Sequence, residues 1–446
     1  MAAKFTKNTL ITIATRTLSL IISTMASIII ARILGPEGKG IYALAFVLPS
    51  LLFMFAEFGV SGATVYYVAK GKYSPKDIFA VNVALSIAVG VLSSILALII
   101  IFFFRDKVVP GVALEYLLLA VPFIPLYIFQ SYTAAILLGL QKIKKYNFSS
   151  LVQILVFTLL ICVFLWGLHR GVMAVILSSL AAYLINNLVL FLLTLKETGG
   201  ISSRINFSYL RDSFSYGFKT YLGNIFGTIQ SRLDTLLINI FLNPMAVGFY
   251  SIARGLAEHL WLISQSAGAI LFPRVSSQNN REERKKFTPL ICRNVLFVSA
   301  VAAIILFFAG SWLIVLLFSD KFLNSIEPFR ILLIGVTAIS GSIVLGNDLY
   351  GRGKPMLNTY TAALAAGLNV LLNLLLIPRF GIGGAAWAIT TTYTITFLVT
   401  LAIYSKVSGN TINEILFIKK SDFKIYKQLI SLLLKKFKNK MTFSRI

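Results

Sequence analysis

The chain has 446 residues, of which 57% are hydrophobic and only 13% charged, and its mean hydropathy is +0.84. A soluble protein of this size needs more polar residues to cover its core, so the composition excludes a soluble globular protein and indicates an integral membrane protein. The net charge of +25 does not indicate nucleic-acid binding, because the basic residues lie in short segments between apolar runs and in the C-terminal tail.

Apolar runs long enough to cross a bilayer recur along the whole chain. The first run is too long for the apolar region of a secretory signal and has no convincing small-residue cleavage site, so we expect it to be retained. A helix needs about 20 mostly apolar residues to cross a hydrocarbon core about 30 Å thick. We therefore predict an all-α membrane protein with about twelve transmembrane helices, at residues 9–33, 41–66, 78–104, 113–139, 149–168, 172–195, 215–242, 246–272, 290–318, 328–349, 356–377 and 382–405.

The distribution of Lys and Arg predicts that both termini lie in the cytoplasm. With twelve crossings, roughly 30 of the 41 basic residues fall on the cytoplasmic side and roughly 8 on the opposite side. A missed crossing would mix the two sides after the error, and the alternation holds to the end. Residues 409–446, where lysines are mixed with apolar residues, predict a basic amphipathic helix on the anionic lipids of the inner leaflet, with a disordered tail as the alternative.

The second half of the chain repeats a turn of the first half. Residues 34–45 read Leu-Gly-Pro-Glu-Gly-Lys-Gly-Ile-Tyr-Ala-Leu-Ala, and residues 242–253 read Leu-Asn-Pro-Met-Ala-Val-Gly-Phe-Tyr-Ser-Ile-Ala, an offset of 208 (242 minus 34). A weaker echo relates Gly171 to Gly381 at an offset of 210 (381 minus 171). An even number of predicted helices separates the copies, so we predict two six-helix lobes of the same orientation, residues 1–198 and 199–408, with a cavity between them.

Charged residues within the predicted helices concentrate in the first hairpin of each lobe. A charged side chain at the bilayer centre costs about 2.5–3.5 kcal/mol on insertion scales, so it is expected to face an aqueous cavity or a partner. The first hairpin carries Arg16 and Glu57, with Arg32 at the outer end of its first helix. The corresponding hairpin of the second lobe carries Arg232, Asp234, Arg254, Glu258 and His259. We expect the two hairpins to face each other across the cavity.

The arginines predict a negatively charged ligand, since a guanidinium binds phosphate oxygens bidentately. Arg16 has no acidic neighbour in the sequence and is the strongest single candidate. Arg232 and Arg254 are further candidates. Arg32 is a weaker one, because it is close enough to the interface to snorkel there instead.

Three acids are candidates for binding a coupling H⁺ or Na⁺, or for pairing with cavity charges: Asp234, Glu57 and Glu258. Arg254 and Glu258, four residues apart, share a helical face, so mutual neutralisation is as good an interpretation as ligand binding. Arg232 and Asp234, two residues apart, point about 200° away from each other, so we expect one of them to pack against a neighbouring helix. His259 is either a proton shuttle or a hydrogen-bonded packing residue.

No motif for hydrolysis, nucleotide binding or metal binding occurs in the sequence. It has no GxxxxGK[ST] phosphate loop and no HExxH pair, and Cys162 and Cys292 are too far apart in the chain to indicate a disulfide framework or a metal site. We therefore predict a transporter rather than an enzyme, with no catalytic residue and no cofactor, driven by a gradient, a coupling ion or the membrane potential.

Several segments together resemble the polysaccharide-export flippases of the multidrug/oligosaccharidyl-lipid/polysaccharide transporter superfamily, and the resemblance covers nearly the whole chain. The segments that carry it are residues 31–45, Glu57-Phe-Gly-Val-Ser-Gly62, Arg232-Leu-Asp234 followed by Val247-Gly-Phe-Tyr250, and Asn369-(x)3-Asn373-(x)3-Ile377-Pro-Arg-Phe-Gly-Ile-Gly-Gly-Ala-Ala386.

This resemblance implies a two-lobed, V-shaped protein in the cytoplasmic (inner) membrane of a bacterium or archaeon. It would flip undecaprenyl-pyrophosphate-linked oligosaccharide of an O-antigen, capsule or related surface polysaccharide by alternating access. Arg16, Arg232 and Arg254 would hold the pyrophosphate in a cationic cleft, and polysaccharide polymerase or assembly proteins would be its protein partners.

Four other functions stay open at the level of the sequence. Lipid II flippases are similar but usually have additional helices, which this chain lacks. Drug/cation antiporters share the fold but favour acidic cavities, against which the arginines argue. A non-transporting scaffold for glycosyltransferases has no need of charges on cavity-facing helices, and an integral-membrane polymerase tends to have a large outer loop, whereas no predicted outer loop exceeds about a dozen residues.

Overall fold

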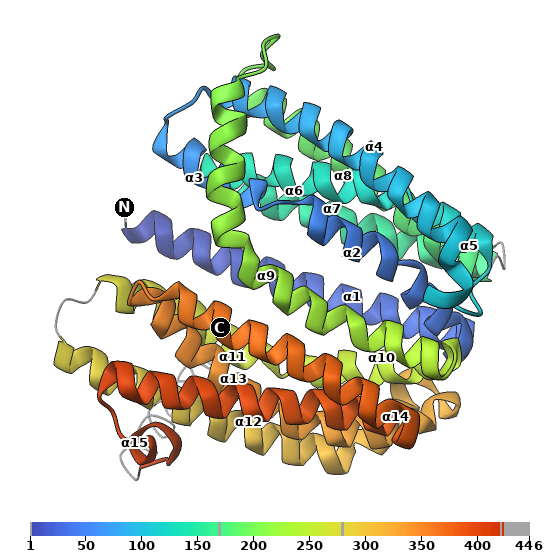
Figure 1. The fold of residues 1–446 in the computed structure, drawn as a ribbon, viewed down its shortest axis with the longest axis vertical. Coiled ribbons are helices and arrows are strands. Elements are labelled where there is room, and N and C mark those ends of the chain that lie inside the picture. Colours follow the sequence, from blue (N-terminus) through green and yellow to red (C-terminus); the bar gives the residue numbers. More distant parts are fainter. Residues whose placement is uncertain (1, 168–170, 278–280, 420–421, 423–446) are drawn as a thin grey trace, which may run out of the picture. The chain divides into compact units, whose positions relative to one another are not determined.

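The computed structural model describes residues 2–167, 171–277, 281–419 and 422. Within these residues every regular element is a helix (Figure 1), which confirms the predicted all-α class. The helices are α1 (Ala2–Ala45), α2 (Val47–Ala56), α3 (Val60–Lys70), α4 (Pro75–Val108), α5 (Leu114–Ala120), α6 (Phe123–Gly139), α7 (Ile143–Cys162), the π-helix η1 (Val163–Gly167), α8 (Gly171–Thr198), α9 (Phe207–Phe241), α10 (Pro244–Glu258), α11 (Trp261–Ser277), α12 (Arg281–Phe318), the 3₁₀-helix η2 (Asp320–Ser325), α13 (Ile326–Gly351), α14 (Pro355–Ser408) and α15 (Ile412–Leu416).

Large apolar side chains lie on the outside of the helices, as expected where lipid surrounds a protein. Phe103 of α4 and Phe308 of α12 are each 76% exposed. Within the described residues, eight helical stretches are long and apolar enough to cross a membrane. They are Thr17–Ala56, Pro75–Val108, Leu114–Gly139, Ile143–Leu165, Gly171–Thr198, Lys285–Phe318, Asp320–Gly351 and Pro355–Ser408. The chain is therefore a multi-pass membrane protein.

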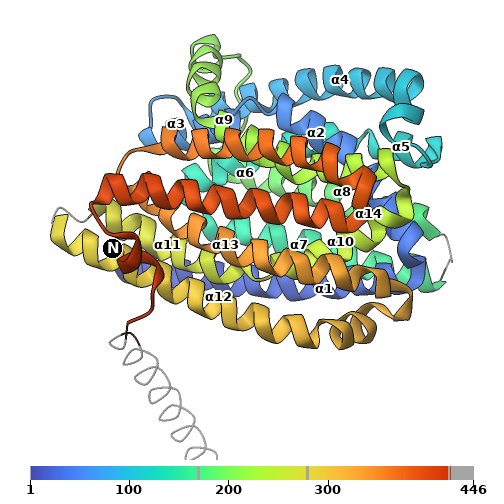
Figure 2. The ribbon, with the colours of Figure 1, turned by 60° about the horizontal axis from the view of Figure 1, so that its bottom comes forward.

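Two of these stretches are longer than a single crossing requires. Thr17–Ala56 has 40 residues and Pro355–Ser408 has 54. Each turns at a glycine with positive φ, Gly35 in α1 and Gly381 in α14, and Figure 2 shows the two arms of α14 as separate helices. The helices α9, α10 and α11, which carry most of the intramembrane charges, are not among the eight. The count of twelve crossings stays a prediction.

The two glycines of the weaker sequence echo have the same backbone conformation. The φ angle is 58° at both Gly171, where α8 begins, and Gly381, where α14 turns. L-residues with a side chain rarely adopt this region, so the glycines are required by the same local geometry. This agreement supports an internal duplication, while the lobe boundaries at 198 and 408 stay predictions.

The helix predicted at 41–66 is interrupted. α2 ends at Ala56 and α3 begins at Val60, because Phe58 (φ 50°) and Gly59 (φ 75°) leave the helical conformation. The predicted helix 246–272 is likewise divided into α10 and α11, at residues 259–260. Both predictions of a continuous helix were wrong at these points. Non-helical backbone at membrane depth is tolerated where it is buried in protein or lines a cavity. Because transporters often bind their ligands at such breaks, residues near these two breaks are candidates for the site.

The chain forms two compact units, each discontinuous in sequence. The first comprises Met1–Arg254, Ser311–Phe329 and Ala366–Ala388, and the second comprises Gly255–Gly310, Arg330–Ala365 and Ile389–Ile446. In the first unit, α6 packs against α4, α7 and α8 (Figure 1).

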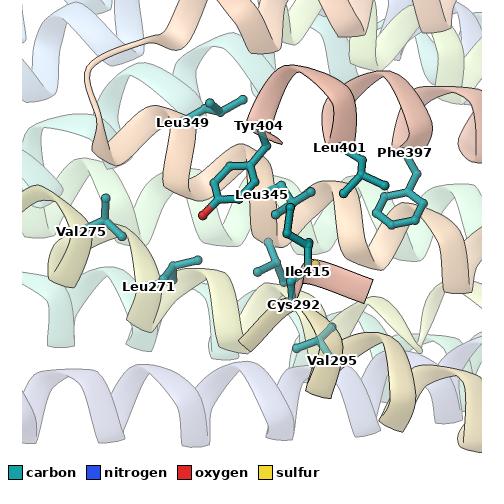
Figure 3. Packing of buried hydrophobic residues seen from close by; sticks show 11 residues of the cluster. Leu271, Val275, Cys292, Val295, Leu345, Leu349, Phe397, Leu401, Tyr404 and Ile415 are labelled. Carbon is teal, nitrogen blue, oxygen red and sulfur yellow. The ribbon is translucent and has the colours of Figure 1, made fainter. Parts of the chain in front are cut away.

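The second unit has an apolar core to which α11, α12, α13, α14 and the short α15 all contribute (Figure 3). Ile415 of α15 is fully buried in it beside Cys292 of α12. Arg293 Nη2 donates to Asp422 Oδ1 at 2.8 Å, so the start of the tail packs on α12. Residues 423–446, which include most of the predicted amphipathic helix, lie outside the described part of the chain.

Candidate functional site

A buried ion pair joins α9 to α10. Arg254 Nη1 lies 2.8 Å from Asp234 Oδ2, and the Tyr250 hydroxyl donates to the same oxygen at 3.2 Å. Asp234 is fully buried, whereas the Arg254 side chain is 12% exposed. The pair therefore neutralises a buried carboxylate in the first unit. Pairing of Arg254 with Glu258 stays a prediction.

Arg232 and Asp234 have opposite environments, as their spacing on a helix predicts. Arg232 is exposed and Asp234 is buried. Arg232 is within electrostatic range of the hydroxyl groups of Tyr127 in α6 and Tyr183 in α8. The more exposed of the two residues is thus the arginine, while the buried acid binds Arg254.

Glu57 occupies the break between α2 and α3. Its Oε2 accepts the Gly59 N–H at 2.7 Å, and its Oε1 accepts the Ser61 N–H at 2.8 Å. These donors lie at the start of α3, where no preceding turn offers a carbonyl. The Tyr132 hydroxyl also donates to the Glu57 backbone carbonyl at 3.1 Å. This geometry gives Glu57 a helix-capping role, and its predicted role in ion coupling has no further support from these contacts.

Arg32 of α1 contacts the C-terminal end of α12. Its Nε donates to the Leu317 carbonyl at 2.9 Å, and its Nη2 donates to the Leu316 carbonyl. The last carbonyls of a helix have no intrahelical donor and carry partial negative charge, so a cation stabilises them. Arg32 thereby closes a helix end, and a ligand would have to compete with these carbonyls.

The remaining candidates are less defined. Arg16 lies in α1, and its side chain is outside the part of the chain that the structure describes. His259 Nδ1 is 2.5 Å from the Gly255 carbonyl, which is consistent with the packing interpretation of this residue. Glu258, the last residue of α10, is partly exposed.

Polar residues without charge also lie deep in the first unit, in addition to the charged candidates that the sequence predicts. Gln130, Gln153, Asn186 and Asn187 of α6, α7 and α8 lie close together and are all at least partly buried. Lys39 is also buried, with its Nζ 3.1 Å from Ser27 Oγ. A search for carboxamides in the middle of apolar runs would have found the first group, whereas nothing in the sequence distinguishes Lys39 from a loop lysine.

The two copies of the repeated turn contact each other through their glycines. A Cβ atom at Gly40 would lie 1.7 Å from the Pro244 carbonyl oxygen, and a Cβ at Gly248 would lie 1.9 Å from the Pro36 carbonyl oxygen. Pro36 and Pro244, like Gly40 and Gly248, are equivalent in the repeat. The contact is therefore reciprocal, and neither position has room for a side chain.

Comparison with known proteins agrees with this architecture. Residues 29–327 match the model of a family described as polysaccharide biosynthesis protein. The chain is 28% identical over 192 residues to a probable low-salt glycan biosynthesis flippase of Haloferax volcanii, a match that covers 41% of this chain and 39% of that protein. It is 23% identical over 380 residues to a putative O-antigen transporter of Shigella flexneri, covering 81% of this chain and 88% of the relative.

The fold is also similar to that of a solved transporter. A structure of the lipid II flippase MurJ in an inward closed conformation superposes with a TM-score of 0.74 at 15% identity, covering 95% of this chain and 96% of that one. At this identity the likeness shows the fold alone. The family and these neighbours are transporters and flippases, not enzymes, in agreement with the predicted class.

Proposed function

The chain belongs to the polysaccharide biosynthesis protein family, and we propose from this premise that it flips an undecaprenyl-pyrophosphate-linked oligosaccharide from the inner to the outer leaflet. The oligosaccharide would be the unit of an O-antigen, a capsule or a related surface polysaccharide. The names of the Haloferax and Shigella relatives support a lipid-linked glycan as the substrate class.

The observation that carries the proposal is the pair of arginines on adjacent helices α9 and α10. Arg232 is exposed, and Arg254, whose side chain is 12% exposed, forms an ion pair with Asp234. Two guanidinium groups can bind a pyrophosphate by charge-assisted, bidentate hydrogen bonds, whereas a lipid-facing arginine would be costly. The oligosaccharide would occupy the cavity while the polyprenyl chain stays in the bilayer, and alternating access would expose the site first to one leaflet and then to the other.

We place the coupling step at the Asp234–Arg254 pair. A H⁺ or Na⁺ on Asp234 would neutralise the carboxylate and release Arg254 for the pyrophosphate. Loss of the ion would restore the pair and weaken ligand binding. In this scheme a cation on Asp234 frees Arg254 for the pyrophosphate, and a pyrophosphate on Arg254 frees Asp234 for the cation. The cation and the anionic lipid therefore bind cooperatively.

The protein would lie in the cytoplasmic membrane with both termini inside, where the basic tail would meet anionic lipids. Its protein partners would be the polymerase or assembly proteins that receive the flipped glycan. The positive-inside pattern supports this orientation.

A second candidate function is lipid II flipping, and the likeness of the fold to MurJ favours it. Lipid II also carries a pyrophosphate, so the arginines do not separate the two substrates. A drug/cation antiporter is disfavoured by those arginines, and a non-transporting scaffold would not need them.

Deletion of the gene tests the proposal and separates the two substrates. Cells without the protein should accumulate an undecaprenyl-pyrophosphate oligosaccharide, measured by mass spectrometry of extracted lipids, and lose surface polysaccharide. Re-expression should restore both. Accumulation of lipid II, or unchanged lipid-linked sugars together with normal surface polysaccharide, would contradict the proposal.

A further inference from the structure

Four carboxamide side chains form a cluster across three helices of the first unit. Gln130 Nε2 of α6 donates to Gln153 Oε1 of α7 at 2.9 Å, and Asn186 Nδ2 of α8 donates to the same oxygen at 3.2 Å. Asn187 Nδ2, next in the chain, donates to the Leu126 carbonyl at 3.2 Å. The amide groups thus form a network in which the side-chain nitrogens of Gln130, Asn186 and Asn187 are the hydrogen-bond donors.

This cluster lies near the middle of membrane-crossing helices. Gln130, Gln153 and Asn186 are close to the midpoints of the candidate crossings Leu114–Gly139, Ile143–Leu165 and Gly171–Thr198. Burying a carboxamide at this depth is unfavourable unless its polar atoms are hydrogen-bonded.

Three side-chain carbonyl oxygens of the cluster accept no hydrogen bond from the described residues. The Oε1 of Gln130 and the Oδ1 atoms of Asn186 and Asn187 are buried and have no hydrogen-bond partner among the residues that the structure describes. Interhelical amide hydrogen bonds alone would explain a satisfied network. They do not explain a set of unused acceptors of one kind, which suits a ligand rich in hydroxyl donors.

Tyrosine rings lie directly beside the amides. The rings of Tyr127 and Tyr183 are 5.0 Å apart between centroids, and the Tyr183 hydroxyl interacts with Gln153. Both rings, like Gln130 and Gln153, are partly exposed, whereas Asn186 and Asn187 are buried. The negative face of an aromatic ring attracts the slightly positive C–H groups of a sugar ring.

The exposed Arg232 is within electrostatic range of both tyrosine hydroxyl groups. A cation for phosphate, aromatic rings for sugar faces and amide oxygens for sugar hydroxyls therefore occur in the same compact unit.

We infer that the amides and tyrosines of α6, α7 and α8 form the subsite for the pyrophosphate-proximal sugars of the transported glycan. The inference rests on the proposed function and assigns its sugar recognition to uncharged residues. The leftover carbonyl oxygens accept hydroxyl hydrogens of the sugar once the ligand enters, Tyr127 and Tyr183 contact its ring, and Arg232 binds the neighbouring phosphate.

Ligand binding by variants tests this subsite. Purified protein in detergent is titrated with two lipids, bare undecaprenyl pyrophosphate and the lipid-linked oligosaccharide extracted from cells that lack the protein, and intrinsic tryptophan fluorescence or native mass spectrometry reports the binding. Gln130→Leu, which removes an unused acceptor, and Tyr183→Leu, which removes a ring, should each weaken binding of the oligosaccharide lipid about tenfold. Binding of the bare pyrophosphate should stay unchanged, whereas Arg232→Gln should weaken both.

Asn82→Leu is the matched control for loss of a buried amide. Asn82 of α4 is buried in the same unit, but its amide bonds Thr64, Tyr132 and Tyr209 and leaves no unused acceptor. This variant should lower stability without changing the ratio of the two affinities. Tyr183→Leu leaves the unused amide oxygens in place, so it gives an answer even if Gln130→Leu does not fold.

The outcomes are distinct. Equal weakening of binding of both lipids, or no effect on either, by the Gln130 and Tyr183 variants would overturn the sugar subsite and leave the proposed function standing. Failure of the unmodified protein to bind either lipid would overturn the proposed function and the subsite with it.

Discussion

At the scale of single residues, the charged side chains with defined contacts are compensated by groups from elsewhere in the fold. Asp234 binds Arg254, Glu57 accepts backbone N–H groups at the start of α3, and Arg32 donates to carbonyls at the end of α12. The sequence identified these charges, because charged residues stand out in apolar helices. It could not identify their partners, since those depend on which helices are neighbours.

Variants of the Asp234–Arg254 pair can separate an effect on stability from an effect on transport. Replacing Arg254 by Gln removes the guanidinium that pairs with the buried Asp234 carboxylate, which should destabilise the protein by about 3 kcal/mol, whereas Asp234→Asn combined with Arg254→Gln should recover most of that loss. Transport should stay impaired in the double variant, because the guanidinium is still absent. Thermal unfolding in detergent and restoration of surface polysaccharide measure the two effects. If the double variant regains transport together with stability, Arg254 has a structural role only.

At the scale of elements, the interrupted helices and the contact between the repeated turns define the structure around the site. The repeat was visible in the sequence because proline, glycine and tyrosine recur at one offset. The reciprocal contact was not visible, because an offset says nothing about which surfaces meet. The break at Glu57 was missed for a related reason: Phe58 and Gly59 lie in an apolar run whose hydropathy is that of a continuous helix.

The reciprocal glycine contact predicts a strict size limit. A methyl group at Gly40 would overlap the Pro244 carbonyl, so Gly40→Ala should destabilise the conformation in which the turns meet by about 1–3 kcal/mol. Gly248→Ala should have the same effect through Pro36. Because transport requires a cycle of conformations, both variants should lower the transport rate while the protein still inserts in the membrane.

Gly227→Ala in α9 is the matched control for this prediction. A Cβ at Gly227 meets no atom within 4 Å, and alanine favours a helix, so this variant should transport normally. The readout is surface polysaccharide at equal protein levels. Normal transport by Gly40→Ala and Gly248→Ala would show that the contact is not used in the cycle.

At the scale of the whole molecule, composition and hydropathy were sufficient to predict a multi-pass helical membrane protein. These properties depend on sums over many residues, so local errors do not change them. The carboxamide cluster of α6, α7 and α8 was not predicted, because single amides in apolar helices are weak signals until their helices are brought together. The predicted lobe boundaries stay predictions, and the two compact units are discontinuous in sequence, with α14 contributing to both.

The most direct measurement of the central claim is translocation by the purified protein in vesicles. The oligosaccharide lipid extracted from deletion cells is incorporated together with the protein, and a membrane-impermeant reagent that oxidises sugars reports which leaflet holds the glycan. With the protein and an H⁺ or Na⁺ gradient, glycans of the inner leaflet should become accessible outside, and the double variant of Asp234 and Arg254 should abolish this movement. No movement with the unmodified protein under either gradient, or movement of lipid II but not of the oligosaccharide lipid, would contradict the account.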